Sequence, residues 1–245
     1  MDRLDFPEKF FITGTDTGVG KTVVSAILMT GLQAAYWKPI QSGLEETTDT
    51  EWIQQATGFP DACFYPETYR LSQPISPHAA AAYDGIQIQL DAFALPDCGR
   101  SRPLIVEGAG GVMVPINAHQ FMTDLIKQLN LPVLLVARSA LGTINHTLLS
   151  LAQLRREGID ILGVVMNGPR NAINRHAIET FGRIRVLAEI EPIMNINIHS
   201  LQEAHQRYFS SGSCRTGSFE NRNPKGADEG QNLKILSGPK VSKFE

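Results

Sequence analysis

The sequence predicts an α/β fold, a doubly wound and mostly parallel sheet with helices on both faces. Short apolar segments alternate along the chain with longer helical patterns. The apolar segments are continuous rather than alternating with polar residues, which is typical of strands that are buried on both faces of a sheet. Turns that contain glycine or proline separate these segments. Together these observations favour one parallel sheet that is covered on both sides.

The elements follow in order along the chain. A strand is expected at residues 10–13, and a helix at residues 23–29 follows it across a glycine-rich turn. Further elements are expected as strands at 34–37, 103–106, 131–137 and 161–166, and as helices at 121–129 and 147–157. Residues 1–210 are expected to form a single domain, because a chain of 245 residues that is 42% hydrophobic can bury a sizeable core. Residues 211–245 are poor in apolar groups and are expected to be a disordered tail.

The composition narrows the class of protein. A formal net charge of −3 indicates no basic surface for nucleic acid or for an anionic membrane. No basic start followed by an apolar run opens the chain, and no apolar run approaches the ~18 residues of a membrane span. The three cysteines are scattered without a C-x-x-C pair, which indicates reduced thiols. We therefore expect a cytoplasmic protein without nucleic-acid or membrane partners.

Residues 14–22, GTDTGVGKT, resemble a phosphate-binding loop with a displaced glycine. The usual pattern is G-x-x-x-x-G-K-[ST], and here Thr15 stands where its first glycine belongs, while Gly14 comes one residue early. The context still favours phosphate binding, because an apolar strand precedes the turn and a helical segment follows it. Free N–H groups at a helix start, with the helix dipole behind them, attract anions.

The residues of this loop suit a nucleotide. Gly18 and Gly20 permit unusual backbone angles and a close approach to a ligand. Lys21 is placed to reach the terminal phosphates, and the Thr22 hydroxyl is placed to hold Mg²⁺. The alternative is an ordinary Gly/Thr turn that carries a solvated lysine.

Charged residues follow two of the expected strands, where open α/β sheets collect their ligands. Lys38 follows residues 34–37 and by itself is more often a solvated lysine. Glu107 follows residues 103–106 and suits a magnesium ligand, with a solvent-facing strand end as the alternative. Asp49 lies in the segment Thr-Asp-Thr-Glu, for which helix capping alone is the preferred explanation. Because no nucleophile motif is present, the chemistry indicated is phosphoryl transfer aided by lysines and a metal.

Four motifs in order, GTDTGVGKT, YWKPIQSG, VEGAGG and LGTINHTLL, resemble the dethiobiotin synthetase family over about residues 10–190. That family has a P-loop NTPase-like fold and its loop places the glycine one position early, so Thr15 is expected there. The resemblance implies an enzyme of biotin biosynthesis, a ligase that uses ATP and Mg²⁺ and works as a cytoplasmic homodimer. Its implied reaction joins 7,8-diaminononanoate and CO₂ into dethiobiotin with formation of ADP and phosphate. The implied route passes through a carbamate and a carbamic–phosphoric anhydride.

The resemblance also implies roles for individual residues. Lys21 and Lys38 would be catalytic, and Thr22, Asp49 and Glu107 would hold Mg²⁺, which reverses the capping preference for Asp49. The implied substrate contacts are Ser42 at the nitrogen end and, across the subunit interface, Thr143 and Asn145 at the carboxylate. The implied ATP contacts are Gly18, Val19, Gly20, Lys21, Thr22, Asp49, Glu107, Gly108, Ala109, Gly110, Asn167 and Gly168, with Asn167 at the adenine edge.

The chain departs from the family pattern in two places. Gly18 stands where some relatives carry glutamate, and Ala188 and Glu191 interrupt the late G-x-I-P segment on the adenine side. Two alternatives share the loop. A partition-type ATPase switch would carry a signature lysine where this chain has Asp16. A cobyrinate-type amide synthase would add a glutaminase domain, for which 245 residues are not expected to leave room.

Overall fold

The computed structural model describes residues 6–99 and 102–210, and the tail expected at 211–245 lies outside them. The strands are β1 (Lys9–Gly14), β2 (Ala35–Trp37), β3 (Ile40–Ser42), β4 (Phe64–Tyr65), β5 (Tyr69–Leu71), β6 (Leu104–Gly111), β7 (Val133–Arg138), β8 (Ile161–Asn167) and β9 (Val186–Ile190). The helices are α1 (Lys21–Leu32), α2 (Asp49–Thr57), α3 (Pro77–Tyr83), α4 (Met122–Leu129), α5 (Thr143–Arg156), α6 (Ala172–Gly182) and α7 (Ile198–His205). Short 3₁₀ turns cover Asp61–Cys63 and Leu90–Ala92, and a π-helical turn covers Gln206–Ser210.

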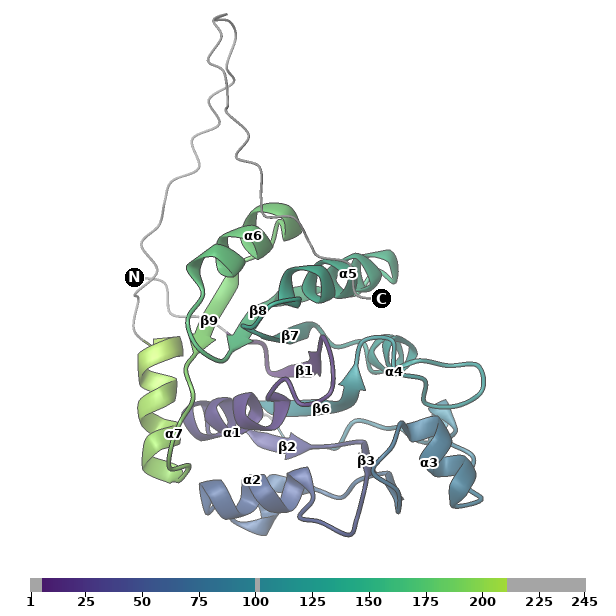
Figure 1. The fold of residues 1–245 in the computed structure, drawn as a ribbon. Coiled ribbons are helices and arrows are strands. Elements are labelled where there is room, and N and C mark those ends of the chain that lie inside the picture. Colours follow the sequence, from purple (N-terminus) through teal and green to yellow (C-terminus); the bar gives the residue numbers. More distant parts are fainter. Residues whose placement is uncertain (1–5, 100–101, 211–245) are drawn as a thin grey trace, which may run out of the picture. The chain divides into compact units, whose positions relative to one another are not determined.

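In the described part of the chain, seven strands form one sheet in the order β4-β2-β6-β1-β7-β8-β9. Every pair of neighbours in this sheet runs parallel. β3 and β5 form a separate parallel pair. Long-range parallel pairing requires crossover connections, and helices supply most of them, as Figure 1 shows. The predicted fold class is therefore confirmed.

Two apolar cores lie on opposite faces of the sheet. Side chains of β1 alternate between them, with Phe10 and Ile12 in one core and Phe11 in the other. Helices α1, α2 and α7 pack on the first face, and α3, α4, α5 and α6 on the second. Figure 1 shows α7 beside α1 and α6 beside α5, in agreement with the helix contacts. Consecutive residues of these strands are apolar because both faces of the sheet are covered by helices.

The centre of the sheet is a topological switch point. β1 and β6 are neighbours, yet α1 leaves β1 toward one face and α4 leaves β6 toward the other. The connections therefore diverge at the carboxyl ends of these strands, which is where doubly wound sheets bind ligands. The glycine-rich loop and Glu107 both belong to this part of the sheet.

One strand boundary differs from the expectation. β6 was expected to end at residue 106, but it continues to Gly111, so Glu107 lies inside the strand and is 0% exposed. The pairing with β1 extends to Gly14 opposite Gly111, with a shift in register after Ile12, and Gly110 has a positive φ of +66°. The alternative of a solvent-facing carboxylate is therefore wrong. Among residues 6–99 and 102–210, every helix is too short or too polar to cross a membrane.

Candidate functional site: the phosphate loop and its carboxylates

The phosphate loop connects β1 to α1. Gly18 and Gly20 have φ angles of +70° and +95°, which lie in the left-handed region where glycine is favoured. Gly20 is the N-cap of α1 and provides no side-chain cap, so no side chain of the cap covers the first N–H groups of the helix. Val19, between the two glycines, is buried and anchors the loop in the core. The loop therefore has the geometry of an anion site at a helix N-terminus.

Asn167, the last residue of β8, contacts this loop directly. Its side-chain nitrogen donates to the Val19 carbonyl oxygen at 3.1 Å. A Cβ atom at Gly20 would lie 2.0 Å from that nitrogen, so any larger residue would force the Asn167 side chain to move. Gly168 follows and also has a positive φ of +128°. The Asn167 side chain therefore links the end of β8 to the phosphate loop.

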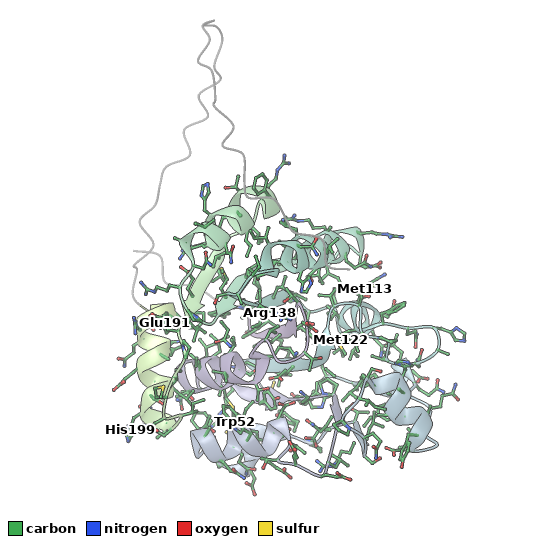
Figure 2. The ribbon with its side chains drawn as sticks, in the orientation of Figure 1. Trp52, Met113, Met122, Arg138, Glu191 and His199 are labelled. Atoms are coloured by element: carbon green, nitrogen blue, oxygen red, sulfur yellow. The ribbon has the colours of Figure 1, made fainter. Side chains whose placement is uncertain are left out.

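Lys21 opens α1 and points back over the loop. Its Nζ atom donates to the Asp16 carbonyl oxygen at 3.2 Å. Burial lowers the pKa of Lys21 and the nearby Lys38 charge adds to this, although Glu107 and other carboxylates act in the opposite direction. The Asp16 carboxylate accepts a hydrogen bond from the Thr17 N–H at 2.8 Å and pairs with Arg138 at the end of β7. Arg138, labelled near the centre of Figure 2, was not singled out in the sequence.

Three oxygen-bearing side chains converge beside the loop. The Thr22 hydroxyl lies 2.7 Å from Asp49 Oδ1 and 3.1 Å from Glu107 Oε1. They come from the first turn of α1, the first residue of α2 and the middle of β6. Elements far apart in the sequence therefore bring together the three residues that the resemblance assigned to one metal.

The oxygen donors suit a particular kind of metal. Within the described residues, no three His, Cys, Asp or Glu side chains gather into a metal-binding group. Two carboxylates and a hydroxyl fit Mg²⁺ instead, because Mg²⁺ usually takes one or two carboxylates and completes its shell with water and substrate phosphates. A nucleotide held by the adjacent phosphate loop would provide those phosphates.

Lys38 is a buried cation between the two carboxylates. It is 4% exposed, pairs with Asp49, and its Nζ atom lies 3.2 Å from Glu107 Oε1. Burial by itself would lower its pKa, but the charges of Glu107 and Asp49 and the hydrogen bonds to them outweigh burial and raise it. The amine therefore stays charged at neutral pH. A solvated surface lysine, the simplest alternative from the sequence, is wrong for this residue.

The helix cap next to this cluster is Thr48, not Asp49. The Thr48 hydroxyl accepts from the Glu51 N–H, and the Glu51 carboxylate accepts from the Thr48 N–H at 2.9 Å. Capping is thus complete without Asp49, whose carboxylate turns to Thr22 and Lys38. Burial would raise the pKa of Asp49, but Lys38 more than compensates and holds it below its usual value. The capping explanation for Asp49 is corrected by this geometry.

The predicted substrate residues come from two elements, β3 and α5. Ser42 ends β3, and its buried hydroxyl has no hydrogen-bond partner in the described part of the chain. Thr143 and Asn145 lie in the first turn of α5, where Thr143 is buried and Asn145 is exposed. No hydrogen bond in the described ranges connects Thr143 or Asn145 to the Lys38 cluster.

The site has the architecture of a P-loop nucleotide-binding protein. A glycine-rich loop connects a strand to a helix that begins with Lys21 and Thr22, and two carboxylates lie opposite this helix start. A family model described as an AAA domain matches residues 8–200. An ATP-dependent dethiobiotin synthetase of Paramagnetospirillum magneticum is 53% identical over 183 residues, which are 75% of this chain and 87% of that protein. One from Bradyrhizobium diazoefficiens is 45% identical over 204 residues, which are 83% of this chain and 96% of that protein. The chain belongs to the ATP-dependent dethiobiotin synthetase family.

A more distant likeness concerns solved structures. A ParA family ATPase from Chlorobium tepidum TLS is 10% identical, with 82% of this chain and 90% of that chain covered at a TM-score of 0.46. A likeness this weak carries no information about function. The fold class is established by the strand order and by the parallel pairing.

Proposed function

We propose that this chain catalyses the ATP-dependent carboxylation and ring closure of 7,8-diaminononanoate to dethiobiotin in biotin biosynthesis. The observation that carries the proposal is Lys38, a charged and buried lysine held between two carboxylates next to a phosphate loop. Two relatives of the chain, at 53% and 45% identity, carry the name dethiobiotin synthetase. Their names favour this reaction over a partition-type switch or a cobyrinate-type amide synthase.

The proposed reaction has three steps. One amine of the substrate adds CO₂ and loses a proton, which gives a carbamate. A carbamate oxygen then attacks the γ-phosphorus of ATP, and ADP leaves, so that a carbamic–phosphoric anhydride forms. Finally, the second amine attacks the carbonyl carbon and loses a proton, and phosphate leaves as the cyclic urea closes.

Two lysines divide the electrostatic work. Lys21, at the start of α1, is the cation for the transferred phosphoryl group. Lys38 offsets the repulsion between the carbamate anion and the terminal phosphate, two groups that must meet although both are negative. A fixed and buried cation suits this task, because it needs no reorganisation when charge develops and is weakly screened by water.

Thr22, Asp49 and Glu107 are the residues that would hold Mg²⁺. When bound, the ion would neutralise charge on the phosphates. The nucleotide itself would rest on the backbone of Gly18, Val19 and Gly20. The remaining ATP contacts proposed are Gly108, Ala109 and Gly110 after Glu107, and Asn167 and Gly168 at the adenine side.

The substrate is proposed to lie across a homodimer. Ser42 would meet its nitrogen end, which agrees with a buried hydroxyl that lacks a partner in the described part of the chain. Thr143 and Asn145 of the other subunit would hold its carboxylate at the start of α5, where helix N–H groups favour an anion. Leu141, 99% exposed, and Leu149, 63% exposed, provide apolar surface on this same helix region. We further propose that the enzyme acts in the cytoplasm without nucleic-acid or membrane partners.

Product analysis tests the proposal. Purified protein with 7,8-diaminononanoate, bicarbonate, ATP and Mg²⁺ should give dethiobiotin, ADP and phosphate in equal amounts by mass spectrometry and coupled assay. ADP formation should require the diamine. ATP hydrolysis that proceeds equally without the diamine, and without any dethiobiotin, would instead support a nucleotide switch.

A further inference from the structure

The carboxylate of Glu107 is divided between two sets of donors. It is 0% exposed, so each of its oxygens needs hydrogen bonds to remain charged inside the protein. Oε1 accepts from Thr22 at 3.1 Å and from Lys38 at 3.2 Å, on the side where the proposed metal lies. Oε2 accepts from the Ser25 hydroxyl at 2.6 Å, the shortest hydrogen bond that the structure gives this carboxylate.

Ser25 lies on α1 one turn after Thr22. Residues three apart on a helix share a face, so both hydroxyls point from α1 toward the same carboxylate of β6. Thr22 contacts one oxygen and Ser25 the other. Ser25 is itself 0% exposed, which shields its hydrogen bond from competing water.

The direction of the Ser25 hydrogen bond is unusual for a helix. Serine and threonine hydroxyls inside helices commonly donate back to the carbonyl oxygen four residues earlier. Thr30 on the same helix does this, with its hydroxyl 2.8 Å from the Ala26 carbonyl oxygen. Ser25 instead donates from α1 to the Glu107 carboxylate of β6. Its hydroxyl therefore serves the site rather than the helix.

We propose that Ser25 is a positioning residue for the metal site: by holding Oε2 of Glu107, it fixes Oε1 toward Thr22 and the Mg²⁺ position. Ser25 does not contact the metal or the substrate in this assignment. A charge-assisted hydrogen bond to a metal-binding carboxylate restricts its rotation and so favours the binding geometry in advance. The inference rests on the proposed function of Thr22, Asp49 and Glu107 as Mg²⁺ ligands.

The test compares Ser25→Ala with Thr30→Val. Both changes remove a buried hydroxyl from α1, but only Ser25 faces the site, and valine keeps the shape of threonine. Mn²⁺ binding is measured by electron paramagnetic resonance with a non-hydrolysable ATP analogue present, and melting temperature is recorded for each protein. Ser25→Ala should weaken Mn²⁺ binding by ~10–100-fold, the usual effect of removing a partner of a metal ligand. Thr30→Val should leave Mn²⁺ binding unchanged.

Activity gives the second readout. Dethiobiotin formation by Ser25→Ala should need more Mg²⁺, and its turnover should recover at saturating Mg²⁺. If Ser25→Ala does not fold, Ser25→Cys replaces it, because the thiol keeps a weaker donor at that position and should give an intermediate loss of metal affinity. Metal affinity equal to that of the wild type, in either variant, would overturn the proposal. A wild-type protein that forms no dethiobiotin would refute the proposed function, whereas the Mn²⁺ measurement would still decide the role of Ser25.

Discussion

The two ends of the candidate site differ in whether their polar side chains have hydrogen-bond or ion-pair partners within the chain. At the phosphate end, Thr22, Lys38, Asp49 and Glu107 form a network in which every one of these side chains has a partner. Lys38 and Glu107 are buried, and Thr22 and Asp49 are partly buried. At the proposed substrate end, by contrast, Ser42 has a buried hydroxyl that lacks a partner among the described residues, and Asn145 is exposed.

This difference indicates that the charged groups for phosphoryl transfer are preorganised within a single chain, whereas the substrate contacts are not. Charges that must stabilise a developing phosphoryl group act best when they are already fixed, because reorganisation during the reaction would reduce their effect. A substrate site can remain open until its ligand or a second subunit arrives, since an unpaired hydroxyl costs less than an unpaired charge.

Lys38→Gln should have the largest effect. The change keeps polarity and much of the length but deletes the buried charge, and it leaves Asp49 and Glu107 without their cation. Dethiobiotin formation should fall by roughly 10²–10³-fold, while binding of a non-hydrolysable ATP analogue, measured by calorimetry, is largely retained. Equal losses of binding and turnover would make Lys38 a nucleotide contact only.

Gly20→Ala should reduce stability and nucleotide binding more than Gly18→Ala. Both glycines have positive φ, which costs a residue with a side chain about 1–2 kcal/mol. At Gly20, however, the new Cβ atom would lie 2.0 Å from Asn167, whereas at Gly18 no atom lies within 4 Å. Melting temperature and ATP-analogue affinity should therefore fall further for Gly20→Ala. Similar losses in both variants would mean that backbone strain alone matters.

Leu141→Asp should separate the subunits and disable the substrate end. Leu141 is 99% exposed beside Gly142 and the start of α5, so a charge there should not unfold a monomer. An apolar anchor of a dimer interface contributes about 2 kcal/mol or more, so light scattering should show a weaker dimer and specific activity should fall on dilution. Met194→Asp, at a residue 91% exposed, is the control. A fully active monomer would refute the shared carboxylate site.

Ser42→Ala should act on substrate binding alone. Its hydroxyl has no partner among the described residues, so removing it costs the folded protein little. If it bonds the substrate, KM for the diamine should rise by about tenfold, the equivalent of one hydrogen bond of ~1.4 kcal/mol. Melting temperature and ATP affinity should stay unchanged. A lower melting temperature with the same KM would assign Ser42 to the fold instead.

Tyr36→Phe should have the smallest effect. The side chain is fully buried, and its hydroxyl has no hydrogen-bond partner within the described residues. Burial, followed by the charges of Glu107 and Asp49, raises the pKa of this hydroxyl well above its usual range, so it remains protonated. Removing an unpaired buried donor should change the free energy of unfolding by less than about 1 kcal/mol. A larger loss in denaturant unfolding would reveal a bond from Tyr36 to Glu107.

The sequence allowed the fold class to be predicted because its main signals are local. Continuous apolar segments mark strands that are covered on both faces, and β1, β7 and β8 lie within two residues of their expected ranges. The shorter strands β3, β4, β5 and β9 were not predicted. Strands of two to five residues leave little periodic pattern, so their formation depends mainly on pairing with partners elsewhere in the chain. The three-residue strand β2 was predicted nevertheless, because its residues are all apolar.

The phosphate loop, the order of the four motifs and the family were all predictable from the amino-acid sequence alone. These properties depend on residue type and spacing along one stretch of chain, which a strand–turn–helix unit preserves. The contacts and the burial of Asp49, Glu107 and Ser25, in contrast, depend on the folded structure. Thr48 caps α2, so Asp49 is free to join Thr22 and Lys38, and β6 continues past Glu107, so that carboxylate is buried against Ser25. The strength of a charge depends on its burial and its partners, and these come from segments that only folding brings together.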